Sequence, residues 1–233
     1  MGVHPRSKTG LFDVSVVIPT LDAARHLPAT LCACHGVGEI VVVDGGSHDD
    51  TVPIARRSGA RVIVSAAGRG IQLHRGAAAA EGEWLLFLHA DTVLGDGWSR
   101  AVSEFTAHRD NRLRAATFQF RLDDRSASAR RLERMVAWRV RRLGLAYGDQ
   151  GLLIHRALYQ SLGGFRALPL MEDVDLVRRI GRGRLTVLAA TAHTSAERWH
   201  QDGWMPRSLR NLSCLILYFL GTPPHLIAKL YRG

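Results

Sequence analysis

Short apolar runs alternate with amphipathic stretches through the first half of the chain. The apolar runs stop at Pro, Gly or a polar residue and lie at 14–18, 39–43, 61–64 and 84–88. Runs of this kind are typical of buried parallel strands. Helical patterns lie at about 23–34, from the capping residues Ser47, Asp49 and Asp50 to Arg57, and at 70–81. The repeated strand–helix units predict an α/β fold whose mostly parallel, twisted sheet is flanked by helices.

The second half of the chain is less regular. Residues 115–122 alternate like a strand, 148–154 form a strand-like turn region, and 172–180 begin a helix with three acids. Residues 125–143 predict a basic helix with seven arginines and one glutamate. Its apolar stripe would consist of Leu132, Met135, Val136, Val140 and Leu143.

The length of 233 residues, without an internal repeat or a low-complexity linker, predicts one domain. Residues 1–12 are polar and basic and predict a disordered tail. The domain then spans 13–233, as a first part at 13–95, a second part at 96–203 and a basic, apolar helical tail at 204–233.

Arginine dominates the charge of the chain. Lys and Arg number 31 against 21 acids, which gives a net charge of +10. Such a surface suits nucleic acid, anionic lipid or phosphorylated substrates, and the charge does not choose among them. Three cysteines are too few for a disulfide framework, which favours a reducing compartment. Because no signal peptide and no spanning stretch of ~18 apolar residues is found, we expect a cytoplasmic protein.

Polar residues follow several of the predicted strands. Asp22, Asp44 and Asp91 each come soon after a strand end, and the carboxyl ends of parallel strands form one edge of a sheet, where ligands bind. Carboxylates at such an edge suit a hard cation that also binds phosphate oxygens. Each acid alone is as well explained by capping the next helix.

Four motifs stand in order along the chain: Ser15-Val-Val-Ile-Pro-Thr-Leu, Val43-Asp-Gly-Gly-Ser-His-Asp-Asp-Thr, Phe87-Leu-His-Ala-Asp-Thr and Met171-Glu-Asp-Val-Asp. From about Val14 to Trp199 the chain resembles the family 2 glycosyltransferases, which have the GT-A fold, and in particular a compact bacterial branch without transmembrane helices. The resemblance implies an inverting, hexosyltransferase-type enzyme that moves a sugar from a nucleotide diphosphate sugar to a hydroxyl or phosphate acceptor. Residues 13–95 would bind the nucleotide sugar, and 96–203 would form the acceptor half.

The resemblance also implies a pocket for a UDP- or GDP-sugar donor. Its candidate residues are Pro19, Thr20, Asp22, Asp44, Gly45, Arg69, Gln72 and Ala90. Asp44 would bond the base, Gly45 would allow close approach of a flat ring, and Arg69 would lie near the diphosphate.

A divalent metal, Mn²⁺ or Mg²⁺, is the implied cofactor. Asp91 matches the last acid of the family's Asp-x-Asp motif and would ligate the metal, whereas His89 replaces the first acid. Imidazole is a softer ligand than carboxylate and would favour Mn²⁺. The other interpretation of His89, a contact to ribose or phosphate, stays open.

Glu172 and Asp173 resemble the acidic pair that supplies the family's general base, and Asp173 is the first candidate. A carboxylate in this role must reach the acceptor hydroxyl. Acids in the first turn of a helix also simply favour its dipole. Residues implied on the acceptor side, or as further contacts, are Asp149, Gln150, His193, Arg198 and Trp199. Ser195 replaces the glutamine of the motif found in processive synthases, which argues against polymer synthesis.

The helix at 125–143 and the tail at 204–233 combine cationic and apolar faces, as segments lying in a membrane interface do. A peripheral position on the inner face of the cell membrane would suit a lipid-linked acceptor. An amphipathic helix packed on the sheet explains the same pattern equally well.

Two other functional classes remain as alternatives. A nucleotidyltransferase would need a Gly-rich loop after the first strand, where the chain has Pro19-Thr-Leu-Asp. A nucleic-acid-binding module is suggested by charge alone, without stacking aromatics or a helix-turn-helix pattern. We therefore expect no nucleic-acid partner.

Overall fold

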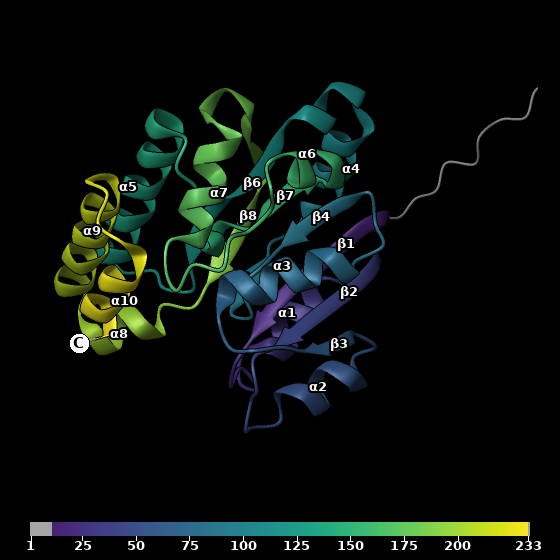
Figure 1. Cartoon of the computed structure of the whole chain (residues 1–233), viewed down its shortest axis with the longest axis horizontal. Helices are drawn as coiled ribbons and strands as arrows, with labels where there is room; N and C mark the ends of the chain where they lie inside the picture. Colours follow the sequence, from purple (N-terminus) through teal and green to yellow (C-terminus); the bar gives the residue numbers. More distant parts are fainter. Residues whose placement is uncertain (1–10, 233) are drawn as a thin grey trace, which may run out of the picture.

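An eight-stranded sheet forms the centre of the computed structural model, which describes residues 11–232 (Figure 1). The strand order is β3-β2-β1-β4-β7-β6-β8-β5. The strands are β1 (Leu11–Thr20), β2 (Val37–Asp44), β3 (Arg61–Val64), β4 (Trp84–Phe87), β5 (Thr92–Leu94), β6 (Ala115–Leu122), β7 (Leu152–His155) and β8 (Leu185–Thr194).

The sheet is parallel where the sequence predicts it and mixed beyond. Strands β1 to β4 pair in parallel, and β6 pairs in parallel with β8. β7 runs antiparallel to both β4 and β6, and β5 antiparallel to β8. The chain enters β7 through Gly151, whose φ is +64° and where a Cβ atom would lie 2.8 Å from Leu88. Only glycine fits this close, left-handed turn without strain.

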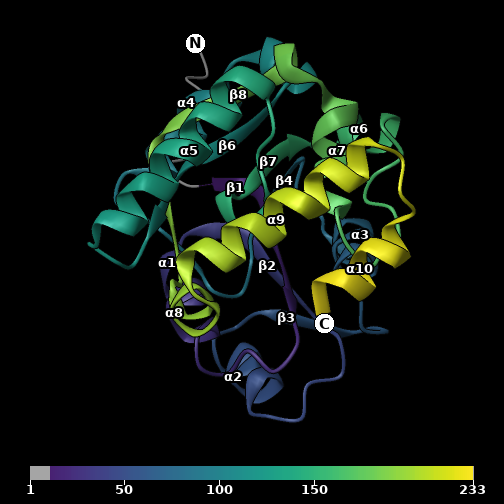
Figure 2. The same ribbon diagram turned by 90° about the vertical axis from the view of Figure 1, so that its left-hand side faces the viewer.

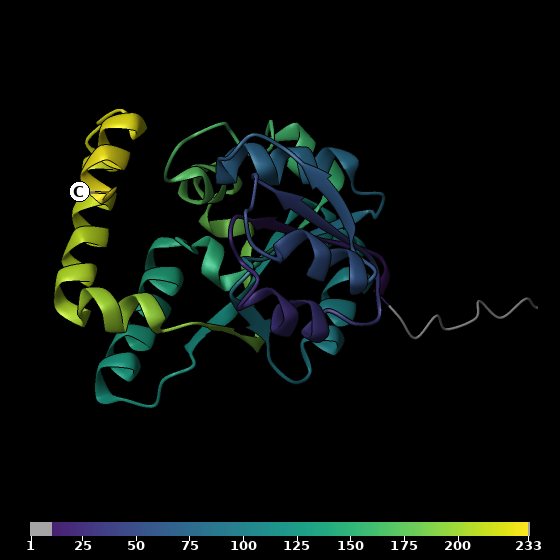
Figure 3. The ribbon, with the colours of Figure 1, turned by 90° about the horizontal axis from the view of Figure 1, so that it is seen from below.

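Helices cover both faces of the sheet. They are α1 (Leu27–Ala33), α2 (Thr51–Arg57), α3 (Arg69–Ala79), α4 (Trp98–Ala107), α5 (Ala127–Leu143), α6 (Arg156–Ser161), α7 (Glu172–Ile180), α8 (Glu197–Asp202), α9 (Trp204–Phe219) and α10 (Pro224–Arg232), with 3-10 segments at Arg109–Leu113, Gly148–Gln150 and Arg182–Arg184. Along β1, Val16 and Ile18 pack with α1, α2 and α4, whereas Val17 packs with α3, α6 and α7. Figure 3 shows α3 and α1 on opposite sides of the first strands.

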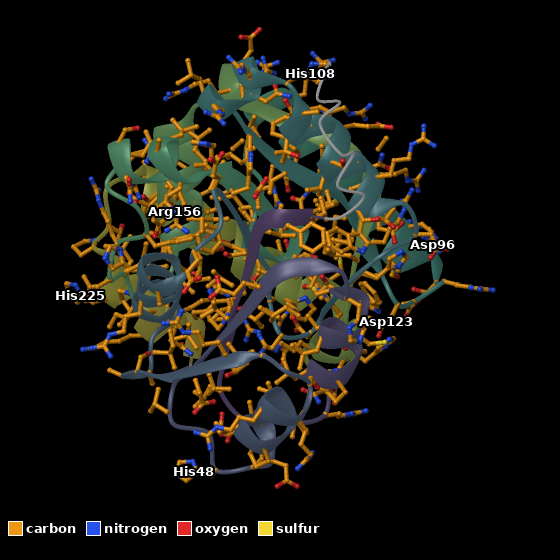
Figure 4. The ribbon with its side chains drawn as sticks, turned by 90° about the vertical axis from the view of Figure 1, so that its right-hand side faces the viewer. His48, Asp96, His108, Asp123, Arg156 and His225 are labelled. Atoms are coloured by element: carbon orange, nitrogen blue, oxygen red, sulfur yellow. The ribbon has the colours of Figure 1, made fainter. Side chains whose placement is uncertain are left out.

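One side chain ties the α3 layer to the sheet. Arg156, at the start of α6, donates hydrogen bonds to the carbonyl oxygens of Ala77 (3.1 Å), Ala80 (2.6 Å) and Gly82 (2.9 Å). These are carbonyls at and beyond the end of α3, which have no partner within the helix. Arg156 is half-buried and lies within the outline of the molecule in Figure 4, whereas His48, Asp96 and His108 lie at its rim.

Several predicted boundaries shift. Residues 1–10 of the predicted disordered tail lie outside the described residues, but Leu11 and Phe12 open β1. Leu11 is buried and pairs with Val37, so the sheet extends further than the apolar run indicated. The predictions for β3, β6 and α7 coincide with the structure. β5, α4 and β8 were not predicted. In β8 the buried positions include small residues such as Ala190 and Ala192, so its apolar alternation is weak in the sequence.

The stripe predicted for the basic helix is partly wrong. Met135 and Leu143 are exposed, and Ala129, Glu133, Val136 and Val140 form the buried side of α5. Glu133, the single acid of the helix, accepts hydrogen bonds from Arg121, Arg130 and the backbone N–H of Leu122. A buried carboxylate with these partners is compatible with the core. The buried side of α5 therefore includes Glu133 and differs from the predicted apolar stripe.

The last helices form a separate layer at one end of the molecule. α8, α9 and α10 lie with α5 at the left of Figure 1 and on the face toward the viewer in Figure 2. Trp199 and Trp204 pack against the buried side of α5, while Cys214, Leu215 and Ile227 pack with residues at the start of α7. Asp202 accepts hydrogen bonds from Arg207 and Arg210 and fixes α8 to α9. Within residues 11–232, no helix is both long and apolar enough to span a bilayer.

Candidate active site

Two adjoining cavities open at the carboxyl ends of β1 and β4. The larger cavity has a volume of about 540 Å³ and lies over the first strands and the start of α3. Six predicted donor residues line it: Pro19, Thr20, Asp22, Arg69, Gln72 and Ala90. Its position matches the general location of ligand sites in open α/β sheets.

The smaller cavity, of about 150 Å³, lies on the side of the last helices. Its walls include Asp149, Asp173 and Trp199, together with residues of α9 and α10. Four side chains line both cavities and form the wall between them: Arg69, His89, Asp91 and Arg198. Groups bound in the two cavities would therefore meet at these residues.

His89 and Asp91 stand at the end of β4 with chemistry that fits a divalent cation. Within the part of the chain that the structure describes, no group donates a hydrogen bond to the Asp91 carboxylate, although its backbone oxygen accepts one from Ser195. Burial, and after it the charge of Arg69, lower the pKa of His89 to about 4. The imidazole is then neutral near pH 7, as metal ligation requires.

The site does not hold a complete protein ligand set. Among residues 11–232, no group of three or more His, Cys, Asp or Glu side chains is placed to hold a metal ion. One or two protein ligands are usual where substrate phosphates and water complete the coordination of Mg²⁺. Asp91, with or without His89, therefore fits a metal that arrives with a diphosphate.

Glu172 and Asp173 begin α7 but have different surroundings. Glu172 is 1% exposed and forms an ion pair with Arg69. Burial raises the pKa of Glu172, against the lowering effect of Arg69. Asp173 lines the smaller cavity, and its oxygens accept hydrogen bonds from the N–H groups of Gly148 (2.8 Å) and Val174 (2.7 Å). These bonds fix the Asp173 carboxylate, whose remaining lone pairs can accept further bonds.

Asp149 lines the same cavity with an unusual carboxyl group. Its Oδ1 atom is buried and has no hydrogen-bond partner among the described residues. Burial, opposed by Arg139 and reinforced by Asp173 and Asp91, raises the pKa of Asp149 to about 6. Displaced pKa values of this kind concentrate at functional sites.

The sequence profile described as Glycosyl transferase family 2 matches residues 15–156. This match covers β1 to β7 and includes Thr20, Asp22, Arg69, His89, Asp91 and Asp149.

The chain belongs to glycosyl transferase family 2.

Curated relatives match over a shorter segment. A PGL/p-HBAD biosynthesis glycosyltransferase of Mycobacterium tuberculosis is 42% identical over an alignment of 91 residues that covers 34% of this chain and 36% of the relative. An uncharacterised glycosyltransferase of Mycobacterium bovis is 38% identical over 85 residues, which are 36% of this chain and 39% of that protein. The chain thus spans less than half the length of these relatives.

Solved structures share the fold. Glucosyl-3-phosphoglycerate synthase of M. tuberculosis, in complex with phosphoglyceric acid, has a TM-score of 0.54 and 22% identity over 78% of this chain and 70% of that one. Residues 1–349 of S. aureus TarS have a TM-score of 0.59 and 18% identity over 88% of this chain and 65% of TarS. The predicted GT-A-type fold is confirmed.

Two predicted donor residues of this family 2 chain do not line the larger cavity. Asp44 is 2% exposed and accepts hydrogen bonds from Thr20 (3.0 Å) and from the N–H groups of Gly46 (2.9 Å) and Ser47 (2.8 Å). Burial raises its pKa, but these hydrogen bonds outweigh burial and lower the pKa of Asp44 overall. A Cβ atom on Gly45 would lie 3.1 Å from Gln72. Both residues therefore shape the β2–α2 loop, and Asp44 binds N–H groups of that loop rather than the N-terminus of α2, which begins at Thr51.

Gln72 has a similar supporting position although it lines the cavity. It is 4% exposed, and its side-chain N–H₂ group donates to the carbonyl oxygens of Thr20 and Val43, each at 2.8 Å. It thereby holds the ends of β1 and β2 together, next to the site.

Two residues predicted on the acceptor side lie elsewhere. Gln150 is 2% exposed and its side chain donates to the carbonyl oxygen of Phe118 (3.1 Å), so it belongs to the core. His193 is an exposed residue of β8, and its Nε2 lies 2.9 Å from the Thr191 hydroxyl, outside both cavities. Strand alternation points His193 away from the buried Thr194, which lines the smaller cavity.

The sequence interpretation missed residues that complete the smaller cavity. Arg207, Asn211 and Cys214 on α9 and Tyr231 on α10 contribute to its wall. Arg207 is 8% exposed, donates to Asp202 (2.6 Å) and lies 3.3 Å from the Tyr231 hydroxyl. Arg207 lies on the same buried side of α9 as Cys214 and Leu215, which is unusual for an arginine. Among the many arginines of the tail, this position did not stand out in the sequence.

Proposed function

We propose that this chain is an inverting glycosyltransferase that moves a sugar from a nucleotide diphosphate sugar to an acceptor hydroxyl or phosphate. The observation that carries the proposal is the wall shared by the two cavities. Asp91 and Arg69 line both cavities and would bind the diphosphate of the donor, and Asp173 lines the smaller cavity only. Family membership supports the same chemistry.

The larger cavity suits the donor. At about 540 Å³ it falls within the usual range of small-ligand sites. Structures of two proteins with the same fold contain UDP-glucose or UDP-GlcNAc, which favours a uridine nucleotide as the first donor to test. Pro19, Thr20 and Asp22 would contact the nucleoside, and Arg69 would contact the diphosphate.

Asp91 would hold a divalent metal, with His89 as second ligand or as a phosphate contact. When bound, Mn²⁺ or Mg²⁺ would stabilise the charge that develops on the leaving diphosphate. Related structures with the fold contain Mn²⁺ or Mg²⁺ together with UDP. The neutral imidazole of His89 favours Mn²⁺ over Mg²⁺.

Asp173 would accept the proton of the acceptor hydroxyl. Its carboxylate is held by two backbone N–H groups and faces the smaller cavity. An acceptor in that cavity approaches the sugar from the side opposite the leaving diphosphate, so the anomeric configuration inverts. Arg69, held by Glu172, neutralises charge on the leaving group.

We also propose a cytoplasmic position at the inner face of the cell membrane, with a lipid-linked acceptor. The support is the cationic and apolar character of α5, α9 and α10, since the last two of these helices border the smaller cavity.

A donor panel tests the proposed activity. UDP- and GDP-sugars are incubated with the protein and Mn²⁺ or Mg²⁺, and release of the nucleoside diphosphate is measured. We expect release that depends on metal, and a loss of at least about a hundredfold in Asp91→Ala. Asp96→Ala, at an exposed acid outside both cavities, is the control. Full metal-dependent turnover in Asp91→Ala contradicts the role of Asp91. Tight, salt-sensitive DNA binding without turnover of any donor contradicts the transferase itself.

A further inference from the structure

The two faces of α9 differ in chemistry. Its inner face carries Arg207, Asn211 and Cys214 toward the smaller cavity. Its outer face carries a row of large apolar side chains that are between 48% and 70% exposed, namely Met205, Leu209, Leu212, Ile216 and Phe219. Their spacing of four, three, four and three residues places them in one stripe along the helix. A continuous exposed apolar stripe marks an interaction surface more often than isolated exposed residues do.

The stripe continues onto neighbouring elements. Leu226 and Leu230 on α10 are exposed at a spacing of one helical turn. A groove of about 590 Å³, with Leu143 at the end of α5 among its lining residues, adjoins the last turn of α9. The guanidinium of Arg178 lies 4.7 Å from the ring of Phe219 at this groove. Figure 2 shows α5, α9 and α10 together on the face toward the viewer.

Cations surround the apolar residues on α5. Met135 and Trp138 are 60% and 56% exposed, and the exposed residues beside them on the helix include Arg131, Arg134 and Arg141. The only acid of α5 is the buried Glu133, and the sequence from 204 to 233 contains no acid. This charge pattern fits an anionic surface with an apolar interior. Two such faces would repel each other, which disfavours a second copy of the chain as the partner.

We propose that the outer sides of α5, α9 and α10 form a docking face for an anionic phospholipid bilayer. The apolar stripe enters the boundary between headgroups and acyl chains, and the arginines contact lipid phosphates. Because α9 also lines the smaller cavity, docking places that cavity next to the bilayer surface. The second part of the inference rests on the proposed function: the acceptor then reaches the active site from the bilayer, along α9.

Vesicle co-sedimentation of the full chain tests the docking face. We expect sedimentation with phosphatidylcholine vesicles that contain about a third phosphatidylglycerol, and much less with pure phosphatidylcholine. The variant Leu209→Gln/Leu212→Gln/Ile216→Gln should bind at least about tenfold more weakly, because the apolar insertion is lost. Leu113→Gln/Val187→Gln, at exposed apolar residues outside these helices, should bind like the wild type.

A charge variant separates the arginines from the stripe. Arg131→Gln/Arg134→Gln/Arg141→Gln should weaken binding to anionic vesicles by about a hundredfold, since each cation near the surface contributes roughly fivefold. Arg56→Gln/Arg57→Gln/Arg109→Gln removes the same charge from exposed sites on α2 and on the 3-10 segment Arg109–Leu113. Equal losses in both triple variants would show attraction by net charge alone and would overturn the docking face.

Trp138 reports directly on the orientation of the bound protein. A blue shift of tryptophan emission, and quenching by brominated lipid, should appear on vesicle binding and disappear in Trp138→Phe. Vesicle binding with no change at Trp138 would place the contact on another face and overturn the proposal.

Donor turnover, measured as nucleoside diphosphate release without added acceptor, allows the docking face and the proposed function to be tested separately. Retained turnover in the stripe variant, together with lost vesicle binding, supports the docking face. A wild-type protein that turns over donor without binding vesicles overturns the docking face alone, and vesicle binding without turnover of any donor overturns the activity alone. A wild-type dimer that becomes a monomer in the stripe variant, with no vesicle binding, would assign the stripe to a second copy.

Discussion

The larger and the smaller cavity share Arg69, His89, Asp91 and Arg198, yet their other walls come from different kinds of structure. The larger cavity is built mainly at the ends of parallel strands and at the start of α3, within the first 91 residues. The smaller cavity combines η2, at Gly148–Gln150, with the start of α7 and with α9 and α10. The first wall follows from local strand–helix units, whereas the second needs contacts between segments far apart in the sequence.

The largest expected effect concerns the one acid that the smaller cavity would use as a base. Asp173→Asn keeps the size of the side chain and removes its basicity, so we expect turnover to fall by roughly a thousandfold. Donor affinity, measured by calorimetry, should change little, because Asp173 does not line the larger cavity. Asp149→Asn is the matched variant. A greater loss of turnover in Asp149→Asn than in Asp173→Asn would exchange the roles of the two acids.

Asp44, which lies outside the lining of the larger cavity, should act on folding more than on binding. Asp44→Ala leaves the N–H groups of Gly46 and Ser47 without their acceptor and the Thr20 hydroxyl with only the more distant carbonyl oxygen of Val43, so the free energy of unfolding should fall by about 3 kcal/mol. Urea denaturation measures this change. Asp50→Ala, at an exposed acid of the same loop, should cost less than about 0.5 kcal/mol. A stable Asp44→Ala protein that no longer binds donor would instead support a direct contact between Asp44 and the base of the donor.

The pKa of His89 in the shared wall and that of Asp149 in the smaller cavity are shifted with opposite effects on stability. The pKa of His89 is lowered to about 4, so its contribution to stability is lost as pH falls below its unfolded value near 6.5. The pKa of Asp149 is raised to about 6, so its contribution is lost as pH rises from its unfolded value of 3.8 through 6. The two effects oppose each other in the wild type.

Single variants should therefore separate these two titrations. Between about pH 4.5 and 6, His89→Gln should lose roughly 2 kcal/mol of stability as pH rises, and Asp149→Asn should lose a similar amount as pH falls. Urea unfolding across this range, without metal, measures both. Parallel pH profiles for wild type and variants would contradict the burial of these groups.

The smallest expected effect is on the wall that α9 supplies. Asn211 lines the smaller cavity but not the larger one. Asn211→Ala should therefore raise the KM for the acceptor about fivefold, through the loss of one hydrogen bond, and leave kcat nearly unchanged. Ser213→Ala, on the exposed side of the same helix, is the control. An effect of Asn211→Ala on the KM for the donor would contradict the division into two cavities.

The sequence predicted the first cavity well because its chemistry follows strand ends directly. Asp22 and Asp91 could be placed from apolar runs and the polar residues after them, Arg69 was implied by the resemblance to the family, and all three line the larger cavity. The sequence could not show that the Asp44 carboxylate accepts hydrogen bonds from Ser47 and Thr20, because these bonds depend on the three-dimensional path of the loop. Arg207 and Tyr231 escaped prediction because the contact joins α9 to α10, and the pattern of one helix does not reveal its partner.

The shared wall also has a kinetic consequence. Because the two cavities share four lining residues, a donor and an acceptor bound as proposed would occupy the protein at the same time, and the sugar would pass between them in one displacement. No covalent sugar–protein intermediate is needed. Initial rates measured at several fixed concentrations of the second substrate should then give intersecting rather than parallel double-reciprocal lines. In this proposal neither substrate has to leave before the other enters.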